Sequence, residues 1–300
     1  MKKKVMKEST AWQIGAHTVM IIGSLLAILP FILLVIASFT DNQTALVNGY
    51  SFTPEKWSLE AYQYIASEWA TIGRAYLMTI LVTVIGTALS LVITSTFAFA
   101  VSNDKLPGHK ILMFLCIFTM LFNGGLVASY YVYSNIFHIK NTIWALIVPT
   151  FLMSPFNVVL VKNYFSNSIS PSILEAARMD GAGVFAVFTK IVIPLSVPIM
   201  ATVGLMTAIG YWNDWTNGLY YLTENGGAQY YTIQLVLNRI NENINFLANN
   251  SDVAAKAAQQ LPSTTMRMAI AVIGILPIMC AYPFFQKYFV KGITLGGVKE

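Results

Sequence analysis

Uninterrupted apolar runs, each long enough to cross a lipid bilayer, recur along this chain. The first, from Thr18 to Phe39, contains no Lys, Arg, Asp or Glu. A helix needs about 20 consecutive apolar residues to span the hydrocarbon core of a membrane. Similar runs follow at residues 75–101, 110–128, 142–162, 195–213 and 267–289. The pattern predicts an all-α integral membrane protein with six transmembrane helices.

Composition excludes an ordinary soluble domain. Only 10% of the residues are charged and 56% are apolar, whereas soluble domains contain roughly 25% charged residues. The net charge of +5 could suggest nucleic acid as a partner, but the basic residues are scattered between apolar runs.

The run after the four N-terminal lysines is longer than the apolar core of a secretory signal, about 7–15 residues. We therefore expect it to remain as the first span.

The distribution of positive charge predicts the orientation. Six spans place both termini on the same side of the membrane. With the N-terminus inside, the segments assigned to the cytoplasm hold twelve of the eighteen Lys and Arg residues, as the positive-inside rule requires. We therefore expect residues 1–16 to form a cytoplasmic segment, residues 17–289 the transmembrane domain and residues 290–300 a cytoplasmic tail.

Residues 170–194 form a polar segment between two apolar runs, on the predicted cytoplasmic side. Ser170–Pro171 is typical of a helix start, and Ser172 with Glu175 three residues later matches a capping box. Gly181 can adopt the left-handed conformation that ends a helix. The first half of the segment therefore predicts one short helix that ends near Gly181.

The second half of the same segment predicts another short helix. Phe185 and Phe188 are three residues apart, so they should share one helix face. Pro194 and Pro198 then mark the start of the next long helix. Together the two short helices predict an elbow at the mouth of the membrane bundle.

The elbow resembles the E-A-A…G…I-x-L-P motif of the permease subunits of bacterial ATP-binding-cassette (ABC) importers. The matching residues are Glu175, Ala176, Ala177, Asp180, Gly181, Ile191 and Pro194. In that family the elbow is a coupling helix that docks in a cleft of the cytoplasmic ATPase, so the resemblance implies an ATPase-coupling role for these residues. Ile193 stands where the motif usually has leucine, which conserves an apolar side chain.

Further segments are similar to the maltose-type (MalG-like) branch of that family. They are Asn141–Leu146, Tyr211–Asp214 and Phe285–Gly292. The resemblance covers most of the chain and is closest to the LplC/YtcP-type subgroup for complex sugars. It implies the type I ABC importer permease fold in a bacterial cytoplasmic membrane. The implied partners are a second homologous permease, two cytoplasmic ATP-binding subunits, an extracytoplasmic solute-binding protein and a sugar substrate, with no nucleic acid.

Motifs for independent chemistry are missing from the sequence. The chain has no Gly-Lys pair and therefore no G-x-x-x-x-G-K-[ST] phosphate loop. We expect no enzyme activity and no cofactor on this chain, with ATP and Mg used by a partner ATPase. His17, His109 and His138 are too far apart to suggest a shared metal site, and Cys116 and Cys280 fall in apolar runs, where a reduced thiol is the default.

Two other functions stay open at this point. A stand-alone secondary carrier often has two similar halves and acidic residues at mid-membrane. This sequence shows no internal repeat, and its predicted span interiors contain no Asp or Glu. An ABC permease for a non-sugar solute remains compatible with the elbow. A membrane-embedded enzyme would need paired acids, a His cluster or a nucleophile motif, and none is visible in the sequence.

Aromatic and amide side chains at the outer half of the predicted bundle could line a sugar pathway. Rings present an apolar face to a pyranose and amides satisfy its hydroxyl groups. The candidates are Asn123, Asn157, Tyr211, Trp212, Asn213 and Asp214. An interfacial aromatic belt is the alternative for rings at a span end.

A polar stripe and two long outer segments complete the expectations. Thr83, Thr87, Ser90 and Thr94 recur at helical spacing, which favours close helix packing over a pathway lining.

The segment from Asp41 to Gly73 predicts a short interfacial helix. The segment from Gly218 to Thr265 predicts a helix from Thr232 to about Ile240, and long loops of this kind are often functional.

Overall fold

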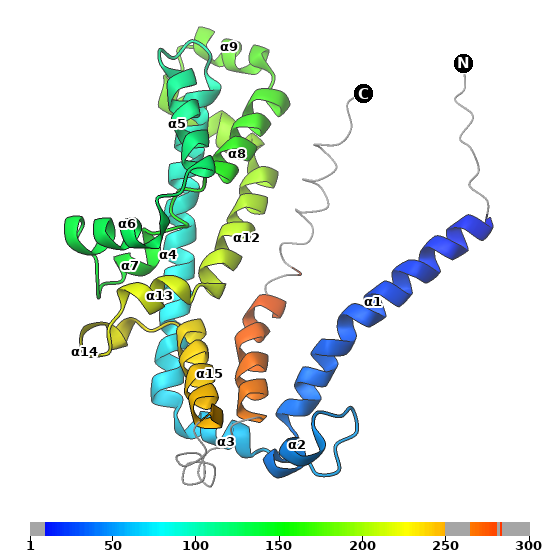
Figure 1. Ribbon diagram of the computed structural model, residues 1–300. Coiled ribbons are helices and arrows are strands. Elements are labelled where there is room, and N and C mark those ends of the chain that lie inside the picture. Colours follow the sequence, from blue (N-terminus) through cyan, green and yellow to red (C-terminus); the bar gives the residue numbers. More distant parts are fainter. Residues whose placement is uncertain (1–9, 250–264, 281–282, 284–300) are drawn as a thin grey trace. The chain divides into compact units, whose positions relative to one another are not determined.

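The computed structural model describes residues 10–249, 265–280 and 283 of the chain, and these residues are predominantly helical (Figure 1). The helices are α1 (Thr10–Ser38), α2 (Asn42–Asn48), α3 (Glu60–Ser67), α4 (Trp69–Ser102), α5 (His109–Leu121), α6 (Gly125–Tyr131), η1 (Val132–Ile136), α7 (Trp144–Ile147), α8 (Pro155–Ser168), α9 (Pro171–Met179), α10 (Val184–Val187), η2 (Phe188–Val192), α11 (Ile193–Leu195), α12 (Val197–Asn213), α13 (Thr216–Tyr221), α14 (Glu224–Gly227), η3 (Ala228–Tyr230) and α15 (Ile233–Asn249). A further apolar helix covers Thr265–Cys280. The chain divides into two compact units, residues 1–68 with 240–275 and residues 69–239 with 276–300.

In the first unit, the chain doubles back directly after α1. Thr40 and Trp57 form an antiparallel bridge, and the Lys56 ammonium lies 3.2 Å from the Asp41 carboxylate. Tyr62 of α3 stacks on Phe39, with ring centroids 4.8 Å apart. These contacts fix the hairpin at residues 40–57 to the end of α1, whose own apolar window is not buried by the described residues.

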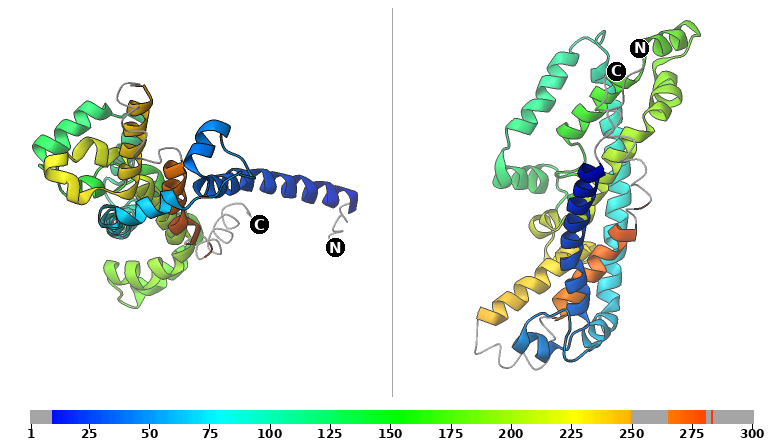
Figure 2. Two further views of the ribbon diagram at one scale, coloured as in Figure 1. Left: turned by 90° about the horizontal axis from the view of Figure 1, so that it is seen from below. Right: turned by 90° about the vertical axis from the view of Figure 1, so that its right-hand side faces the viewer.

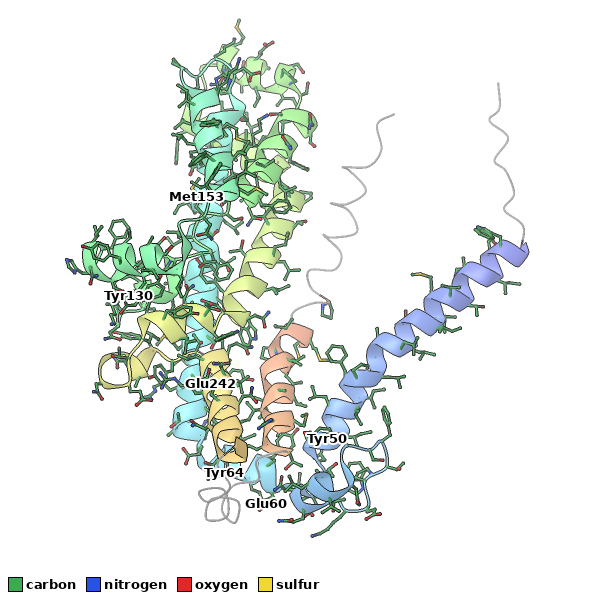
Figure 3. The ribbon with its side chains drawn as sticks, viewed as in Figure 1. Tyr50, Glu60, Tyr64, Tyr130, Met153 and Glu242 are labelled. Carbon is green, nitrogen blue, oxygen red and sulfur yellow. The ribbon has the colours of Figure 1, made fainter. Side chains whose placement is uncertain are left out.

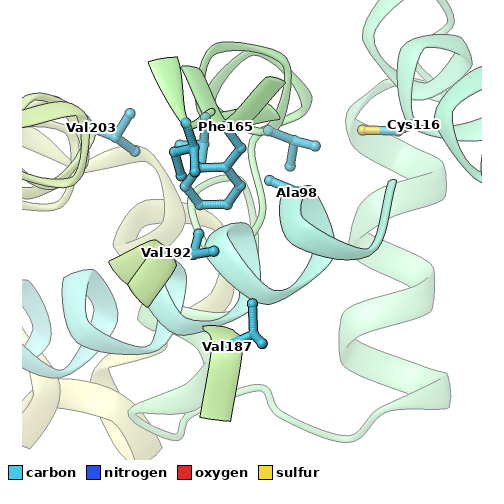
Figure 4. Packing of buried hydrophobic residues seen from close by; sticks show 9 residues of the cluster. Ala98, Cys116, Phe165, Val187, Val192 and Val203 are labelled. Atoms are coloured by element: carbon cyan, nitrogen blue, oxygen red, sulfur yellow. The ribbon is translucent and has the colours of Figure 1, made fainter. Parts of the chain in front are cut away.

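In the second unit, α4 is the central helix, and α5, α8 and α12 pack against it (Figures 1 and 2). Its 34 residues correspond to about 51 Å at 1.5 Å per residue, which exceeds the roughly 30 Å hydrocarbon core. A buried apolar cluster joins α4 to α5, α8 and α12 at one end of this unit (Figure 4). The cluster comprises Ala98, Cys116, Val158, Val161, Phe165, Ile169, Val187, Val192 and Val203.

The contact between α4 and α12 depends on a glycine. Tyr211 of α12 is only 1% exposed, and a Cβ atom at Gly86 of α4 would lie 2.5 Å from its ring. Ser90 and Thr94, on the same stripe of α4, are also buried, and the Ser90 hydroxyl donates to the Phe151 carbonyl at 3.1 Å. The packing interpretation of the stripe is therefore supported.

The helices follow some of the predicted spans and break others. The span near 18–39 corresponds to α1, and α4 contains the span at 75–101. The span at 110–128 is not straight, because α5 ends at Leu121 and the next limb turns by 119°. The span at 142–162 is wrong as a single helix: the chain is non-helical between α7 and α8. Pro155 accounts for the start of α8, since the preceding Ser154 is extended, as is usual before proline. Pro149 follows the end of α7 and has no amide hydrogen to continue that helix.

The fifth span and the outer segments match more closely. The structure has α12 at Val197–Asn213, where residues 195–213 were predicted, and α15 includes the helix predicted from Thr232. The segment from Asp41 contains two short helices, α2 and α3, rather than one. The sixth span is described only through Cys280 and at Pro283. Residues 1–9 and the tail at 290–300 lie outside the described residues.

Substitution of Gly86 tests the close approach of α4 and α12. We expect Gly86→Ala to lower stability by about 1–3 kcal/mol, because an added methyl group overpacks a buried ring. Gly23→Ala in α1 is the matched control, since nothing lies within 4 Å of a Cβ atom there. Thermal unfolding of both purified variants in detergent checks this, and equal melting temperatures would contradict it.

Candidate coupling elbow and pathway residues

The elbow begins at a proline rather than at a capping box. Ser170 precedes α9 in extended geometry and Pro171 opens the helix, but the Ser170 side chain makes no capping hydrogen bond. Its hydroxyl lies 2.7 Å from the hydroxyl of Ser172 instead. The capping-box prediction for Ser172 and Glu175 is therefore wrong, because α9 already begins one residue before Ser172.

Gly181 ends α9 as predicted. Its φ of 80° is in the left-handed region, which favours glycine. The Gly181 amide donates to the Arg178 carbonyl at 3.0 Å, and the Ala182 amide donates to the Ala177 carbonyl at 2.9 Å. These two bonds form a Schellman motif, which satisfies carbonyls at the end of a helix. Asp180 is the residue at which the chain leaves α9.

One face of the elbow packs against the membrane bundle. Ala177, Ala182 and Phe188 contact the apolar cluster of Figure 4, and Val187 and Val192 belong to it. Phe188 also lies against Phe99 of α4, with ring centroids 5.1 Å apart. The elbow is therefore attached to α4 and α8 through side chains from both of its halves.

The opposite face of the elbow is exposed and apolar. Met179 is 88% exposed, Val184 73% and Phe185 79%. The prediction that Phe185 and Phe188 share one face is thus wrong, since only Phe188 packs inward. Glu175 and Ala176 are exposed as well, and none of the described side chains forms an ion pair with Glu175 within 4 Å. This face offers three bulky apolar side chains beside an unpaired carboxylate.

The elbow leads into α12 through a bend. Ile191 is half-buried in η2, and Pro194 lies at the start of the three-residue helix α11. The limb Val184–Leu195 meets α12 at 80°. Pro198, at the first turn of α12, is therefore the proline that opens the long helix, while Pro194 precedes the bend.

The predicted pathway residues are distributed over several elements. Tyr211 is buried, and its hydroxyl donates to the Ile147 carbonyl at 2.8 Å. Trp212 is buried and lies 6.2 Å from the ring of Tyr76. Asn213 is exposed and donates to the Ile209 carbonyl of its own helix at 3.0 Å. In this conformation, only Asn213 of these three residues presents a polar group at the surface.

Asp214 organises the start of α13. Its carboxylate accepts hydrogen bonds from the Thr216 amide at 3.0 Å, the Asn217 amide at 3.2 Å and the Asn217 side chain at 2.7 Å. Burial raises the pKa of the Asp214 carboxyl, and the bonds from Asn217 and Thr216 oppose that rise. A capping role for Asp214 follows from this geometry.

The two remaining asparagines occupy different environments. Asn157 of α8 is 6% exposed, and its amide donates to the Thr207 hydroxyl of α12 at 3.2 Å. Asn123 lies at the sharp turn between α5 and α6, where its side-chain oxygen accepts from the Gly125 amide at 2.8 Å. Asn157 therefore links two helices, and Asn123 stabilises a bend.

Sequence reasoning missed the network around the break between α7 and α8. The carbonyls of Ile147, Pro149 and Phe151 accept bonds from Tyr211, Asn217 and Ser90, respectively. Thr150, within the break, has a φ of 70°, which is rare for a β-branched residue. The two prolines indicate the break in the sequence, but the side-chain donors come from distant segments.

No group of three or more His, Cys, Asp or Glu residues suited to a metal ion occurs among the residues that the structure describes.

Comparison with known proteins decides the family. The family described as the binding-protein-dependent transport system inner membrane component matches residues 13–295. The chain belongs to this family. It is thus a transport permease with no cofactor of its own, and not an enzyme.

Individual relatives agree with that assignment. This permease is 36% identical to the polygalacturonan/rhamnogalacturonan transport system permease protein YtcP of Bacillus subtilis (strain 168), over 92% of this chain and 94% of YtcP. It is 34% identical to protein LplC of the same strain, over 91% of this chain and 90% of LplC. A solved bacterial ABC transporter involved in import of the acidic polysaccharide alginate contains a chain with a TM-score of 0.79 and 28% identity, covering 94% of this permease and 99% of that chain.

A double-mutant cycle tests whether Asn157 acts in packing or in the pathway. We expect Asn157→Ala to destabilise the permease by about 1–3 kcal/mol, because the buried Thr207 hydroxyl loses its donor. Thr207→Val should cost less when added to Asn157→Ala than when made alone, since the two side chains share one bond. Thermal unfolding and the KM of uptake are measured together. A KM that changes from sugar to sugar without loss of stability would place Asn157 in the pathway.

Proposed function

We propose that this permease translocates carbohydrate, an oligosaccharide, across the bacterial cytoplasmic membrane as part of an ATP-driven ABC importer. The observation that carries the proposal is the elbow, which packs on α4 and α8 with one face and exposes Met179, Val184 and Phe185 with the other. Exposed apolar patches on soluble surfaces mark sites of protein association. The functions of two similar proteins, transport of polygalacturonan/rhamnogalacturonan and import of alginate, support a carbohydrate substrate.

Coupling follows from the two faces of the elbow. ATP binding would close a pair of partner ATPases, and the docked elbow would move with them. Because Phe188 contacts Phe99 and the Schellman turn packs on the same cluster, a displacement of the elbow is transmitted to α4 and α8. Glu175, Ala176, Ala177, Asp180, Gly181, Ile191 and Pro194 are the residues that we assign to this coupling.

The complete importer in this proposal has further parts. A second, homologous permease completes the pathway, and two ATP-binding subunits use ATP and Mg on the cytoplasmic side. An extracytoplasmic solute-binding protein delivers the sugar to the outer face. This permease contributes six spans with both termini in the cytoplasm, with α5 and α6–η1 counted as one bent span and the elbow at 170–194 on the cytoplasmic side. The pathway residues remain Asn123, Asn157, Tyr211, Trp212, Asn213 and Asp214.

Purification of the tagged permease in a mild detergent from its native cell tests the assembly, with mass spectrometry of the proteins that stay bound. A cytoplasmic ATPase and a second six-span protein are expected. Uptake by the purified permease alone in liposomes, without ATP, would instead favour the stand-alone secondary carrier, which the family membership leaves without support.

Substitutions in the elbow test the coupling. Glu175→Ala combined with Gly181→Ala should abolish ATP-driven uptake while the permease remains inserted, because one change removes the free carboxylate and the other strains a φ of 80° by about 1–2 kcal/mol. Phe185→Gln alone should reduce recovery of the ATPase.

Val127→Gln is the matched control, since Val127 is also an exposed apolar residue but lies on α6. It should leave ATPase recovery unchanged. Normal uptake by the Glu175/Gly181 double variant would remove the elbow from the mechanism.

A further inference from the structure

Lys140 is an isolated charge in an apolar part of the chain. From Ile111 to Val161 the sequence contains no other Lys or Arg and no Asp or Glu. In the structure Lys140 lies on the loop between η1 and α7, and its side chain is half-buried.

The Lys140 ammonium is held by a tyrosine and not by an acid. Its Nζ atom donates to the Tyr130 hydroxyl at 2.6 Å. Nζ is 5.2 Å from the centroid of the same ring, which places it beyond the hydroxyl and nearly in the ring plane, so the contact is a hydrogen bond rather than a cation–π interaction. Lys56 and Arg239 lie within 4 Å of carboxylates, as does the His109 ring. No described carboxylate therefore lies within 4 Å of Lys140.

Hydrogen bonds on both sides of Lys140 fix its backbone. The Ile139 amide donates to the Tyr133 carbonyl at 3.1 Å, and the Asn141 amide donates to the Tyr221 carbonyl at 3.0 Å. The Asn141 side-chain oxygen also accepts from the Thr223 amide at 2.7 Å. Because the backbone on both sides of Lys140 is already held by hydrogen bonds, the loop loses little backbone freedom when a ligand binds.

The tyrosine that holds the ammonium is itself supported by aromatic rings. Tyr130, labelled on α6 in Figure 3, stacks on Tyr221 with centroids 5.8 Å apart and an interplanar angle of 11°. Tyr133 meets Tyr221 edge to face at 5.9 Å. Tyr131, the neighbour of Tyr130, is exposed. The buried Tyr221 ring therefore supports Tyr130, while the exposed Tyr131 ring beside it offers an apolar surface to a sugar ring.

Lys140 and Tyr130 together offer only donors to a ligand. The ammonium has three N–H groups and uses one on Tyr130, and the phenol, having accepted that bond, can still donate its own proton. A carboxylate accepts several such bonds, and bonds between ionised groups are among the stronger ones. The pair is thus complementary to an anionic oxygen ligand.

We infer that Lys140 and Tyr130 form a carboxylate-binding subsite for an acidic oligosaccharide, one that contains uronic acid units. The inference rests on the proposed function, because it names the chemical class of the transported sugar. Lys140 binds the carboxylate, Tyr130 adds a second hydrogen bond, and the hydrogen-bonded loop at residues 139–141 holds the ammonium in place.

The test uses the whole importer, with its partner permease, ATPases and binding protein, in liposomes. The probes are a trimer of α-linked galacturonate and the same trimer as its neutral methyl ester. Lys140→Gln should raise the KM for the acidic trimer about ten-fold, as expected for loss of a hydrogen bond to a charged group, and should leave the KM for the ester unchanged. Lys140→Arg should retain the preference for the acid, and Tyr130→Phe should weaken it.

Lys105→Gln is the matched control, because it removes the same charge from an exposed turn. Equal loss of acid and ester transport in Lys140→Gln would overturn the subsite in favour of a structural or lipid-binding role. Unchanged transport of both probes would overturn it as well. If the wild-type importer moves neither trimer with ATP while its subunits remain assembled, the proposed function fails, irrespective of Lys140.

Discussion

Inside the hydrocarbon core of a membrane, no water is present to form hydrogen bonds with backbone groups that a helix break leaves unpaired. The second unit of the structure satisfies such groups with side chains. Non-helical backbone at membrane depth must be buried in protein or line a polar cavity. Between α7 and α8, three carbonyls in residues 147–151 accept bonds from Tyr211, Asn217 and Ser90. The three donors come from α12, α13 and α4. The break therefore joins helices that are distant in sequence, and it cannot be straightened without the loss of all three bonds.

The same helices extend from this break to the elbow. Gly86 lets the Tyr211 ring lie directly against α4, so α4 and α12 are closely packed near the middle of α4. Near the C-terminal end of α4, Phe99 contacts Phe165 of α8 and Phe188 of the elbow. Protein interiors are densely packed and transmit displacement with little compression. A movement imposed on the elbow would thus reach the break through two apolar contacts and one long helix.

Local signals in the sequence predicted the end of α9 at Gly181, but they did not predict the break between α7 and α8. The stop at Gly181 depends on its own conformation and on bonds within five residues, so a short motif predicts it. The capping box at Ser172 failed because a proline one residue earlier already opens the helix. The donors for the break lie some 60 residues away in sequence, as for Ser90 with Phe151, and periodicity carries no information on such pairs. The hydropathy pattern identified Lys140 only as a charged residue in a loop. Its hydrogen bond to Tyr130 depends on the folded path of that loop, which the pattern does not predict.

The exposed apolar face of the elbow has a consequence for the life of the subunit before assembly. Met179, Val184 and Phe185 are attached to a rigid turn, so an unassembled copy cannot hide them by refolding locally. Cellular chaperones and proteases continuously remove proteins that spend time in incompletely folded or unprotected states. The lifetime of this permease should then follow the supply of the protein that covers the elbow. Turnover of surplus copies would keep the subunits in balanced amounts without any separate regulator.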